Sequence, residues 1–480
     1  MTEPNLEEIQ NIENLLVNPS HEKLEELKQK FLTKLCEEFK VDLSEFNGEM
    51  AIIKTQITAL QTLKMHRLNC GVQKYGWGRR GRDSKVALFK QSQDPSFTIT
   101  DSETYAELWM GTHSNCPSKI NNTELLSDYI KSNPQQILGD KIVEHFYTKS
   151  DTLKTGDLPF LFKVLSINQA LSIQAHPNKT LAAQLNKNDP KNYPDSNHKP
   201  EMLISISENF QALCGFRPIE EILTHLENYP ELKTLCQGDH GLSSEKNEKN
   251  LKLCFSAMMN QSDSIVSEQL NLLKKRLESS SNRSDLENLF LDLDRQYSND
   301  VGCFSIFLLN LIHMKKGEAI YLSANIPHAY LYGDGVECMA CSDNVVRAGL
   351  TPKFKDVGIL CEMLDYSMKS SEENKLNGFR VNNFMIDYKP SVDEFSVQVI
   401  KIDNSEVLTN GRLEIPSVQS GSILIVTEAS EGLKFECNGE SFEVKEGYVY
   451  FIECDKEINL TSESENCVLN AFRAYCDIKN

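Results

Sequence analysis

The chain has 480 residues, which at about 150 residues per domain predicts about three domains. Hydrophobic residues make up 40% and charged residues 25%, so a disordered, collagen-like or disulfide-stapled chain is excluded. The formal net charge is −19, from 50 Lys and Arg against 69 Asp and Glu, and so acidic a surface disfavours nucleic acid and anionic membranes as partners. A phosphorylated ligand therefore needs a local basic site.

The first residues, Met1-Thr-Glu-Pro-Asn-Leu-Glu-Glu, form neither a basic leader nor an apolar stretch. No apolar run approaches the roughly 20 residues that span a bilayer. The 14 cysteines are scattered, and Cys36, Cys214, Cys303 and Cys361 stand singly among apolar residues. This pattern predicts buried, reduced thiols in a cytoplasmic protein.

Residues 1–64 alternate acidic and apolar positions at helical spacing, and Ser20 is a candidate N-cap. Breaks at Asn18-Pro19 and Asn47-Gly48 divide the segment into two or three helices. We predict a helical N-terminal extension that forms a local bundle or docks a partner.

From Leu68 the sequence changes to short β-rich runs separated by Gly, Asn, Asp and Pro. Runs of this length are too short for helices and predict an all-β core. The runs are Lys85–Phe89, Phe160–Ser166, Ala170–Ala175 and Met202–Ser205.

From Pro218 to about Asn310 the apolar residues return to helical spacing between polar loops, which predicts a helical insertion. The expected helices are Ile219–Leu226, Leu251–Met259, Ile265–Leu277, Leu286–Leu293 and Phe304–Ile312.

Strand-like sequence resumes at Ala319–Leu322 and continues, after one expected helix at Val357–Leu364, almost to the end of the chain. Turns such as Asn438-Gly439 separate the runs, a pattern typical of a second β-sandwich or barrel. Two β domains flanking a helical one account for the length. The expected C-terminal strands are Ser396–Ile402, Ser422–Thr427, Leu433–Cys437, Tyr448–Ile452 and Val468–Ala471.

Two short motifs favour ordinary structure over chemistry. Gly76–Gly81 spells G-x-G-x-x-G, but no buried strand precedes it and an expected strand follows it, so a dinucleotide site is disfavoured. The alternative is a glycine-rich loop in which Trp77 faces a ligand. Cys338-Met-Ala-Cys341 has no second metal-binding pair nearby and predicts buried thiols on a strand.

The segment Leu171–His176 has a different character. In a strand, Ser172, Gln174 and His176 share one face while the apolar residues between them share the other. A polar stripe that ends in His suits ligands that converge on a cavity. A surface strand edge fits the same spacing equally well.

Polar residues also gather around Glu201 and around His328, each beside an expected strand. Together with Gln174 and His176 they would offer two imidazoles, a carboxylate and an amide oxygen. This mixed set suits zinc or iron and leaves a position open for substrate or water. No close-spaced pair such as H-x-H supports the site, so the residues alone leave it open.

The stretch Val336–Lys353 interleaves Glu337, Asp343 and Arg347 with apolar residues and ends in Lys353. Charges among small apolar side chains are unusual on a solvated face. Arg and Lys so placed suit a phosphate, because Arg offers a planar fork and Lys a point charge. Salt bridges within the domain are the alternative.

Eight ordered segments of the chain match one known pattern. They are Cys70–Gly78, Tyr105–His113, Leu158–Ser166, Leu171–Lys179, His198–Met202, Leu213–Pro218, Ala324–Tyr330 and Val336–Lys353. In these segments the chain resembles the zinc-dependent type I mannose-6-phosphate isomerases (phosphomannose isomerases), a cupin family. A weaker match at Tyr388–Ser396 carries the resemblance into the C-terminal β region.

The resemblance implies a protein that is mainly β with a helical insertion. A cupin (jelly-roll) catalytic domain, an α-helical domain and a second, C-terminal jelly-roll domain are expected. The boundaries are 1–64 for the helical N-terminal extension, 65–217 and 313–356 for the two parts of the catalytic domain, 218–312 for the helical insertion and 357–480 for the C-terminal β-sandwich domain.

The same resemblance implies one Zn²⁺ per chain and a sugar-phosphate substrate. The reaction implied interconverts D-mannose 6-phosphate and D-fructose 6-phosphate through a zinc-stabilised cis-enediol, and it supplies mannose for GDP-mannose synthesis. The implied metal ligands are Gln174, His176, Glu201 and His328. The family's active-site arginine falls on Arg347, and its substrate-pocket residues fall on Trp77, Lys163, Ser172, Lys199, Tyr330 and Lys353.

Moving hydrogen between C1 and C2 requires a base, an acid and a group that holds the developing negative charge. We favour Lys199 and Glu337 as the proton carriers, with His198 and Asp343 as alternatives.

Two other functions fit the same residues. A non-catalytic cupin that senses sugar phosphates would act through its helical extension, although the presence of every expected ligand argues against it. Two His and one carboxylate also suit an iron oxygenase, which metal analysis would distinguish. We expect a monomer that uses residues 1–64 to dock any partner.

Overall fold

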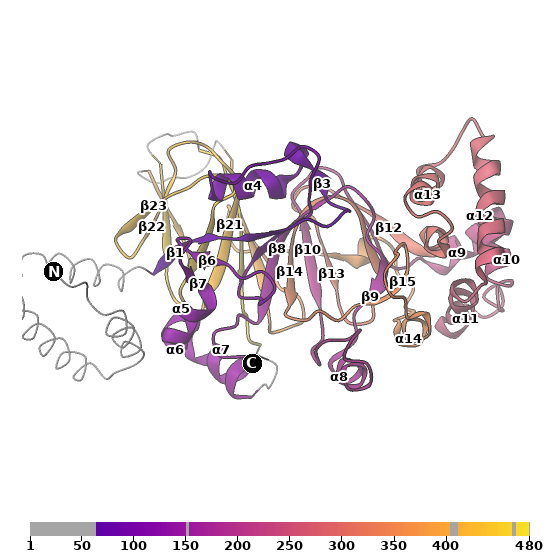
Figure 1. The fold of residues 1–480 in the computed structure, drawn as a ribbon, viewed down its shortest axis with the longest axis horizontal. Helices are drawn as coiled ribbons and strands as arrows, with labels where there is room; N and C mark the ends of the chain where they lie inside the picture. The colour runs from indigo at the N-terminus through magenta and orange to yellow at the C-terminus, as the bar shows by residue number, and fades with distance from the viewer. Residues whose placement is uncertain (1–63, 150–152, 404–410, 463–466, 480) are drawn as a thin grey trace, which may run out of the picture. The chain divides into compact units, whose positions relative to one another are not determined.

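The computed structural model describes residues 64–149, 153–403, 411–462 and 467–479. They belong to one compact unit, Lys64–Asn480. The expected helical extension lies outside the described residues except for Lys64, and so does Cys36. The described part is mainly β with one large helical insertion, which confirms the fold class predicted from the sequence (Figure 1).

An 11-stranded sheet contains the segments that carry the expected site, and β14 (His328–Ala340) is its central strand. The C-terminal part of β14 pairs antiparallel with β8 (Phe160–Ile167) and β10 (Glu201–Ser205). Its N-terminal part pairs with β11 (Phe210–Phe216) and, at His328, with β9 (Ile173–Ala175). The remaining strands are β2 (Gly71–Gln73), β5 (Glu107–Met110), β12 (Leu309–Met314), β13 (Ala319–Leu322), β15 (Val346–Gly349) and β16 (Lys375–Leu376).

Strand β8 shows how the sequence places this sheet between two cores. All eight of its residues are buried. Leu165 and Ile167 join an inner core that also contains Tyr330, whereas Phe162 and Val164 face a second core shared with the C-terminal sheet. The alternation is the period-two pattern of a strand that is buried on both faces.

A nine-stranded sheet contains most of the C-terminal strands, and the predicted strands there are confirmed. Its strand β1 (Met65–Asn69) pairs antiparallel with β24 (Val449–Ile452). The start of the expected catalytic region is therefore built into a sheet of C-terminal strands. The other strands are β6 (Lys119–Ile120), β7 (Glu124–Leu125), β17 (Phe379–Arg380), β18 (Met385–Tyr388), β19 (Ser396–Ile402), β21 (Ser422–Ala429) and β26 (Leu469–Tyr475).

A four-stranded sheet covers the other face of this nine-stranded sheet. Phe435 and Leu460 of the small sheet share a buried core with Leu424 and Tyr450 of the large one. Two sheets packed face to face form the predicted C-terminal β-sandwich. The small sheet consists of β20 (Arg412–Ile415), β22 (Lys434–Cys437), β23 (Glu440–Glu443) and β25 (Ile458–Thr461), and a separate pair consists of β3 (Arg79–Arg80) and β4 (Thr104–Tyr105).

The helical insertion packs behind the strands that carry the expected site. Phe255 and Phe290 from its helices lie in one core with Ile173 of β9 and Val346 of β15. The insertion therefore supports β9 and β15 from the side away from the other sheets (Figure 1). Its helices are α9 (Ile219–Asn228), α10 (Pro230–Leu235), α11 (Glu248–Met259), α12 (Asp263–Glu278) and α13 (Asp285–Gln296).

The predicted strand Lys85–Phe89 is wrong, because these residues begin helix α4 (Lys85–Gln93). The Ser84 side chain accepts a hydrogen bond from Ala87 N and caps the helix, and Val86, Ala87 and Phe89 are buried. A short apolar run does not distinguish a strand from a buried helix, and here the cap decides. A helix thus follows Gly76–Gly81 after all, but the strand before it, β2, pairs antiparallel with β5, unlike the parallel sheet of a dinucleotide fold.

The predicted helix Phe304–Ile312 is also wrong for most of its length. Residues Val301–Phe307 form a 3₁₀ helix, η3, and the chain then enters β12, which pairs with β11. Every residue of η3 is buried, and the apolar spacing of a run that is buried on all sides does not distinguish a helix from a strand. The helix predicted at Val357–Leu364 is confirmed as α14 (Val357–Met363).

The remaining helices lie outside the insertion. They are η1 (Gly81–Asp83), α5 (Leu126–Ser132), α6 (Pro134–Leu138), α7 (Asp140–Val143), η2 (Glu144–Thr148), α8 (Lys179–Asn188) and η4 (Glu372–Asn374).

The thirteen cysteines of the described residues are free thiols, as predicted for Cys214, Cys303 and Cys361. Cys338 is buried on β14 as predicted, but Cys341 follows that strand and is only half-buried, so the prediction of buried thiols on a strand holds for Cys338 alone. Within the described residues, none of the helices has the length and apolar character needed to cross a membrane.

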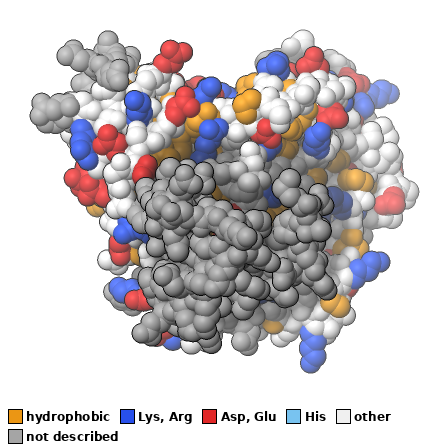
Figure 2. Space-filling model, turned by 60° about the vertical axis from the view of Figure 1, so that its left-hand side comes forward, with side chains coloured by type: hydrophobic (Ala, Val, Ile, Leu, Met, Phe, Trp, Pro, Cys, Tyr) orange, Lys and Arg blue, Asp and Glu red, His pale blue; other side chains and the backbone are white. Residues whose placement is uncertain are grey.

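Acidic and basic side chains are interspersed on the visible described part of the face in Figure 2. The net negative charge is therefore not gathered there into one large patch. A site for an anionic ligand must come from a local grouping of cations.

Candidate active site

Three side chains from the ends of three strands converge on one point. His176 follows β9, Glu201 begins β10 and His328 begins β14, and their ligand atoms all lie within 4.8 Å of one another. His176 Nε2 is 3.3 Å from Glu201 Oε1, and His328 Nε2 is 3.6 Å from Glu201 Oε2. All three residues are buried, so segments far apart in the sequence form one candidate metal centre.

Backbone carbonyl groups orient both imidazoles. His176 Nδ1 lies 2.8 Å from Asn344 O, and His328 Nδ1 lies 2.9 Å from Ile326 O. A ring that donates from Nδ1 keeps the lone pair of Nε2 for a metal. His176 Nε2 and Glu201 Oε2 are buried and make no hydrogen bond within the described part of the chain. Because buried polar atoms seldom lack a partner, these two fit a cation held between them.

Gln174 on β9 reaches the same cluster. Its Oε1 accepts a hydrogen bond from Ser172 Oγ at 2.9 Å, and its Nε2 lies 3.3 Å from His328 Nε2. The Ser172 hydroxyl can bond to either end of an amide, so it can also hold Gln174 with the oxygen toward a metal. Two imidazoles, one carboxylate and one amide form a donor set that suits zinc.

The electrostatics of the cluster keep its ligands free of protons. Burial lowers the pKa of His176 to about 4, against the smaller opposing effect of Glu201. Burial by itself raises the pKa of Glu201, but His176 and Lys199 outweigh it and hold that pKa well below its ordinary value. Lys199 Nζ lies 3.6 Å from Glu201 Oε1. Neutral imidazole and ionised carboxylate are the forms that bind metals.

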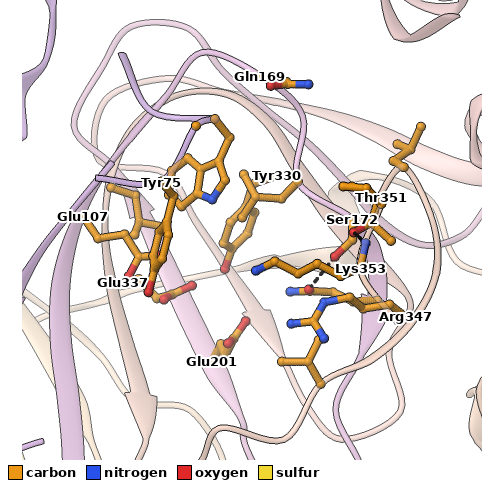
Figure 3. A pocket seen from close by; sticks show the side chains of 18 of the residues that line it. Tyr75, Glu107, Gln169, Ser172, Glu201, Tyr330, Glu337, Arg347, Thr351 and Lys353 are labelled. Carbon is orange, nitrogen blue, oxygen red and sulfur yellow. Dashed lines mark hydrogen bonds between the residues drawn. The ribbon is translucent and has the colours of Figure 1, made fainter. Parts of the chain in front are cut away.

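A cavity of about 680 Å³ opens beside the cluster, and Glu201 and Gln174 are part of its wall. Figure 3 shows two contrasting sides, with Glu107 and Glu337 on one and Arg347 and Lys353 on the other. The cavity is large enough for a hexose phosphate, since ligand pockets commonly measure about 300–1,000 Å³.

The acidic side of the cavity is a buried charge network. Lys163 Nζ lies 3.0 Å from Glu337 Oε2 and 3.6 Å from Glu107 Oε2. Burial by itself lowers the pKa of Lys163, but the two carboxylates outweigh it and raise that pKa. Burial raises the pKa of Glu337 against the effect of Lys163. Lys163, expected to bind substrate, is thus also committed to two carboxylates.

Aromatic side chains form part of the wall between the two sides. Tyr330 is buried beside the cluster, and its Oη makes no hydrogen bond within the described residues. Trp77 lies in the glycine-rich loop and stacks on Tyr75 with ring centroids 5.8 Å apart. Trp77 therefore lies on the cavity wall, where a bound ligand could contact it.

The basic side consists of Arg347 on β15 and Lys353 in the loop after it. Arg347 pairs in register with Gln174, which places its backbone next to the metal cluster. Lys353 Nζ lies 5.7 Å from the centroid of the Tyr75 ring, across the cavity. Burial lowers the pKa of Lys353, as does the neighbouring Arg347. Ser172 and Thr351 lie close to these cations in Figure 3.

Every residue expected at the site lies in the cluster or on the cavity wall. His176 and His328 stand behind the wall, and the others line it. Of the alternative proton carriers, Asp343 lines the cavity, whereas His198 does not and instead lies 2.6 Å from Glu394.

Sequence reasoning missed Glu107, Asp300 and Thr351, which also line the cavity. Glu107 stands in the matched segment Tyr105–His113, so that segment offered a signal. Asp300 lies at the end of the helical insertion, where nothing in the local sequence connects it with the site.

Two family models match the chain. One describes the catalytic domain of type I phosphomannose isomerase and matches residues 65–219. The other describes the helical insertion domain of the same family and matches residues 222–309.

Curated relatives that match most of the chain are named mannose-6-phosphate isomerase. Mannose-6-phosphate isomerases from Homo sapiens and Bos taurus are 41% and 42% identical over 429 residues, covering 85% of this chain and 98% of the relative. The Saccharomyces cerevisiae protein is 40% identical over 439 residues, covering 86% of this chain and 99% of the relative.

Solved structures match the fold over the same extent. A mutant of phosphomannose isomerase from Salmonella typhimurium has a TM-score of 0.73 and 30% identity, covering 87% of this chain and 100% of that one. A mannose 6-phosphate isomerase structure described as zinc-bound has a TM-score of 0.73 and 29% identity over the same shares. On these sequences and structures, the chain belongs to the type I phosphomannose isomerase family.

Proposed function

We propose that this chain is a zinc-dependent aldose–ketose isomerase that interconverts mannose 6-phosphate and fructose 6-phosphate. The observation that carries the proposal is the cluster of His176, Glu201 and His328, in which two buried atoms make no hydrogen bond within the described residues. Glu201 of this cluster lines a cavity that Arg347 and Lys353 also line. The reaction is the one expected from membership of the family. The mannose 6-phosphate that it forms would enter GDP-mannose synthesis.

The metal would be held by His176, Glu201 and His328, with Gln174 as the fourth ligand. A bound zinc ion supplies a Lewis acid that polarises a carbonyl oxygen. One carboxylate among neutral ligands leaves net positive charge at the centre, which favours an anionic transition state. Ser172 would orient Gln174 through the hydrogen bond between their side chains.

Arg347 and Lys353 would bind the substrate phosphate. Both face the cavity on the side opposite Glu337, so a sugar anchored there extends toward the acidic side and the metal cluster. Arg347 supplies two parallel donors and Lys353 a point charge. Trp77 and Tyr330 would enclose the sugar and exclude water, which strengthens these contacts.

Glu337 and Lys199 would move the proton between C1 and C2. The buried Glu337 carboxyl has a raised pKa, which makes its carboxylate a stronger base, and Lys163 holds it in place at 3.0 Å. Lys199 stands beside Glu201, where its ammonium group can donate to a substrate oxygen.

The domain boundaries, the assembly and the location follow as parts of the same proposal. The catalytic domain would comprise residues 65–217 and 313–356. A monomer would suffice for activity, because side chains of one chain line the cavity. Free thiols such as Cys338 and Cys476 support a reducing compartment such as the cytoplasm. Residues 1–64 would dock a partner.

A coupled assay for fructose 6-phosphate tests the proposal. The full chain should convert mannose 6-phosphate, lose activity on chelation and regain it with Zn²⁺. A chain that starts at Met65 should retain the activity, because every proposed site residue follows that position. Binding of the sugar phosphate without turnover, in zinc-loaded protein, would favour the sensor instead.

A further inference from the structure

The loop that carries Lys353 is closed at its base by Asp356 N, which donates to Arg347 O at 2.8 Å. Between these residues the loop leaves the sheet, and Leu350 has a positive φ of 51°. Few residues other than glycine adopt this conformation without support. The support comes from the helical insertion rather than from the catalytic sheet.

Asp300, the N-cap of η3, holds the start of this loop. Its Oδ1 accepts hydrogen bonds from Gly302 N and from Leu350 N, both at 2.8 Å. Its Oδ2 accepts from Thr351 N at 3.5 Å and lies 3.7 Å from Lys355 Nζ. The residue is only 9% exposed. Backbone amides and one ammonium group thus surround the carboxylate.

The backbones of η3 and the loop also pass unusually close to each other. A Cβ on Gly302 would stand 2.7 Å from Leu350 N, and a Cβ on Gly349 would stand 2.7 Å from Gly302 Cα. Only glycine at both positions allows this approach. The approach brings the Leu350 amide within reach of Asp300.

We propose that Asp300 is a positioning residue through which the helical insertion fixes the loop of Arg347 and Lys353 and so sets the affinity of the enzyme for the substrate phosphate. The proposal rests on the proposed function, because it takes these cations to bind the phosphate. Asp300 acts through the backbone of Leu350 and Thr351 and does not itself touch the reacting atoms.

Asp300 places a carboxylate on the wall of a cavity that would receive an anion. Asp300 lines the cavity together with Thr351 and Lys353. Its oxygens are occupied by amide groups and by Lys355, so its negative charge is neutralised locally. Without Asp300, the Leu350 amide would lose its acceptor and the loop would be free to rearrange.

Steady-state kinetics of the zinc-loaded full chain test the proposal in two variants. Asp300→Ala removes every acceptor and should raise KM for mannose 6-phosphate about tenfold or more, with kcat changed about threefold or less. Asp300→Asn keeps an oxygen for the two short amide bonds and should lie closer to the wild type. Zinc content should be unchanged in both.

Asn247→Ala is the matched control, because Asn247 caps α11 in the same insertion and lies away from the cavity. It removes a cap of similar kind and should leave KM unchanged. A KM within about twofold of wild type for folded Asp300→Ala would overturn the proposal. Equal impairment of Asp300→Asn and Asp300→Ala would overturn it as well, because the hydrogen bonds would then not be what matters.

Amide hydrogen exchange of the wild-type protein tests the loop without relying on catalysis or on the folding of a variant. The Leu350 amide should be protected in the zinc-loaded full chain, should exchange faster in Asp300→Ala, and should exchange at a rate closer to that of the wild type in Asp300→Asn. Exchange at the unprotected rate in the wild type would overturn the proposal. If the wild type lacks isomerase activity, the proposed function fails. The hydrogen-exchange result and the binding of inorganic phosphate to the wild type and to Asp300→Ala then still decide whether Asp300 positions an anion-binding loop.

Discussion

The two ends of the active-site cavity are built from different kinds of structure. At the metal end, His176, Glu201 and His328 stand at the ends of three paired strands. At the cation end, Arg347 lies on the short strand β15, which pairs with β9, and Lys353 stands on the loop that follows this strand. The ligand donors are thus fixed by the strand ladder, whereas the position of Lys353 depends on contacts with the helical insertion.

The difference matches what each end must do in the proposed reaction. A metal centre requires donor atoms placed to within a few tenths of an ångström, which paired strands provide. A phosphate group offers three oxygens and lies at some distance from the reacting carbons, so cations on a loop can bind it without such exact placement. Changes at the metal end should therefore abolish the reaction, and changes at the cation end should weaken binding.

The largest effect is expected at the metal end. His176→Ala and Glu201→Ala should each lose bound zinc and reduce kcat at least about 10³-fold, because each removes a buried ligand. Metal analysis of the purified protein and the coupled assay measure the two losses. His225→Ala is the control, since His225 Nδ1 also lies near a backbone carbonyl, Phe307 O at 2.7 Å, but within the insertion. Full activity in a zinc-free variant would contradict the site.

Glu337→Gln should lower kcat by about 10²- to 10³-fold while zinc stays bound, because it removes a proton carrier and leaves the ligands intact. Kinetics with mannose 6-phosphate, together with metal analysis, separate the two properties. Glu453→Gln is the control, because Glu453 is a buried carboxylate that pairs with Lys64 at 3.1 Å next to the nine-stranded sheet. A nearly normal kcat for Glu337→Gln would assign the proton to another residue.

Lys353→Met should raise KM about tenfold or more and change kcat less, because it removes a cation from the loop-held end and leaves the metal untouched. A salt series on the wild type should show the same trend, with KM rising as ionic strength screens the phosphate. Lys375→Met, which removes a lysine paired with Glu318 at 3.1 Å, is the matched control. If kcat fell and KM did not, Lys353 would belong to the chemistry instead.

A change of pH is expected to have the smallest effect on the active enzyme. In the metal-free protein it should clearly change the free energy of unfolding. Burial holds the pKa of His176 at about 4, below the roughly 6.5 of an unfolded chain. The unfolded state therefore binds a proton more readily, and lowering the pH from about 6.5 to 4 should reduce the free energy of unfolding by up to about 3 kcal/mol.

Urea unfolding of chelated protein at pH 7 and pH 5 measures this dependence. His176→Gln should lose part of it, because its side chain does not titrate. Equal pH dependence in the variant and the wild type would show that another group is responsible.

Much of the fold could be predicted because the spacing of apolar residues and the turn residues between the runs mark the helices and strands. The expected strand Ala319–Leu322 and the expected C-terminal strand Ser396–Ile402 are found with the same bounds. The failures at Lys85–Phe89 and Phe304–Ile312 share one cause, since both runs are buried on several sides and carry little period. The Ser84 cap and the pairing of β12 with β11 then decided the outcome.

The site was predictable to the extent that its residues lie in segments matched by the family. From spacing alone, Gln174, Glu201 and His328 were only one option among several, because no short motif joins them. Lys163 appeared as a substrate contact, and its pairing with Glu107 and Glu337 could not be anticipated across strands far apart in the chain.

By itself, the sequence determined which donors and charges this protein carries and the short strand Ile173–Ala175 that carries Gln174, although the structure places Ser172 and His176 just outside that strand. Only the tertiary structure decided that Glu201 and His328 meet them and that Asp300 of the insertion reaches the Lys353 loop. The physical reason is that periodicity depends on residues that are neighbours in the sequence. A site instead depends on strand pairing and packing between residues that are far apart in the sequence.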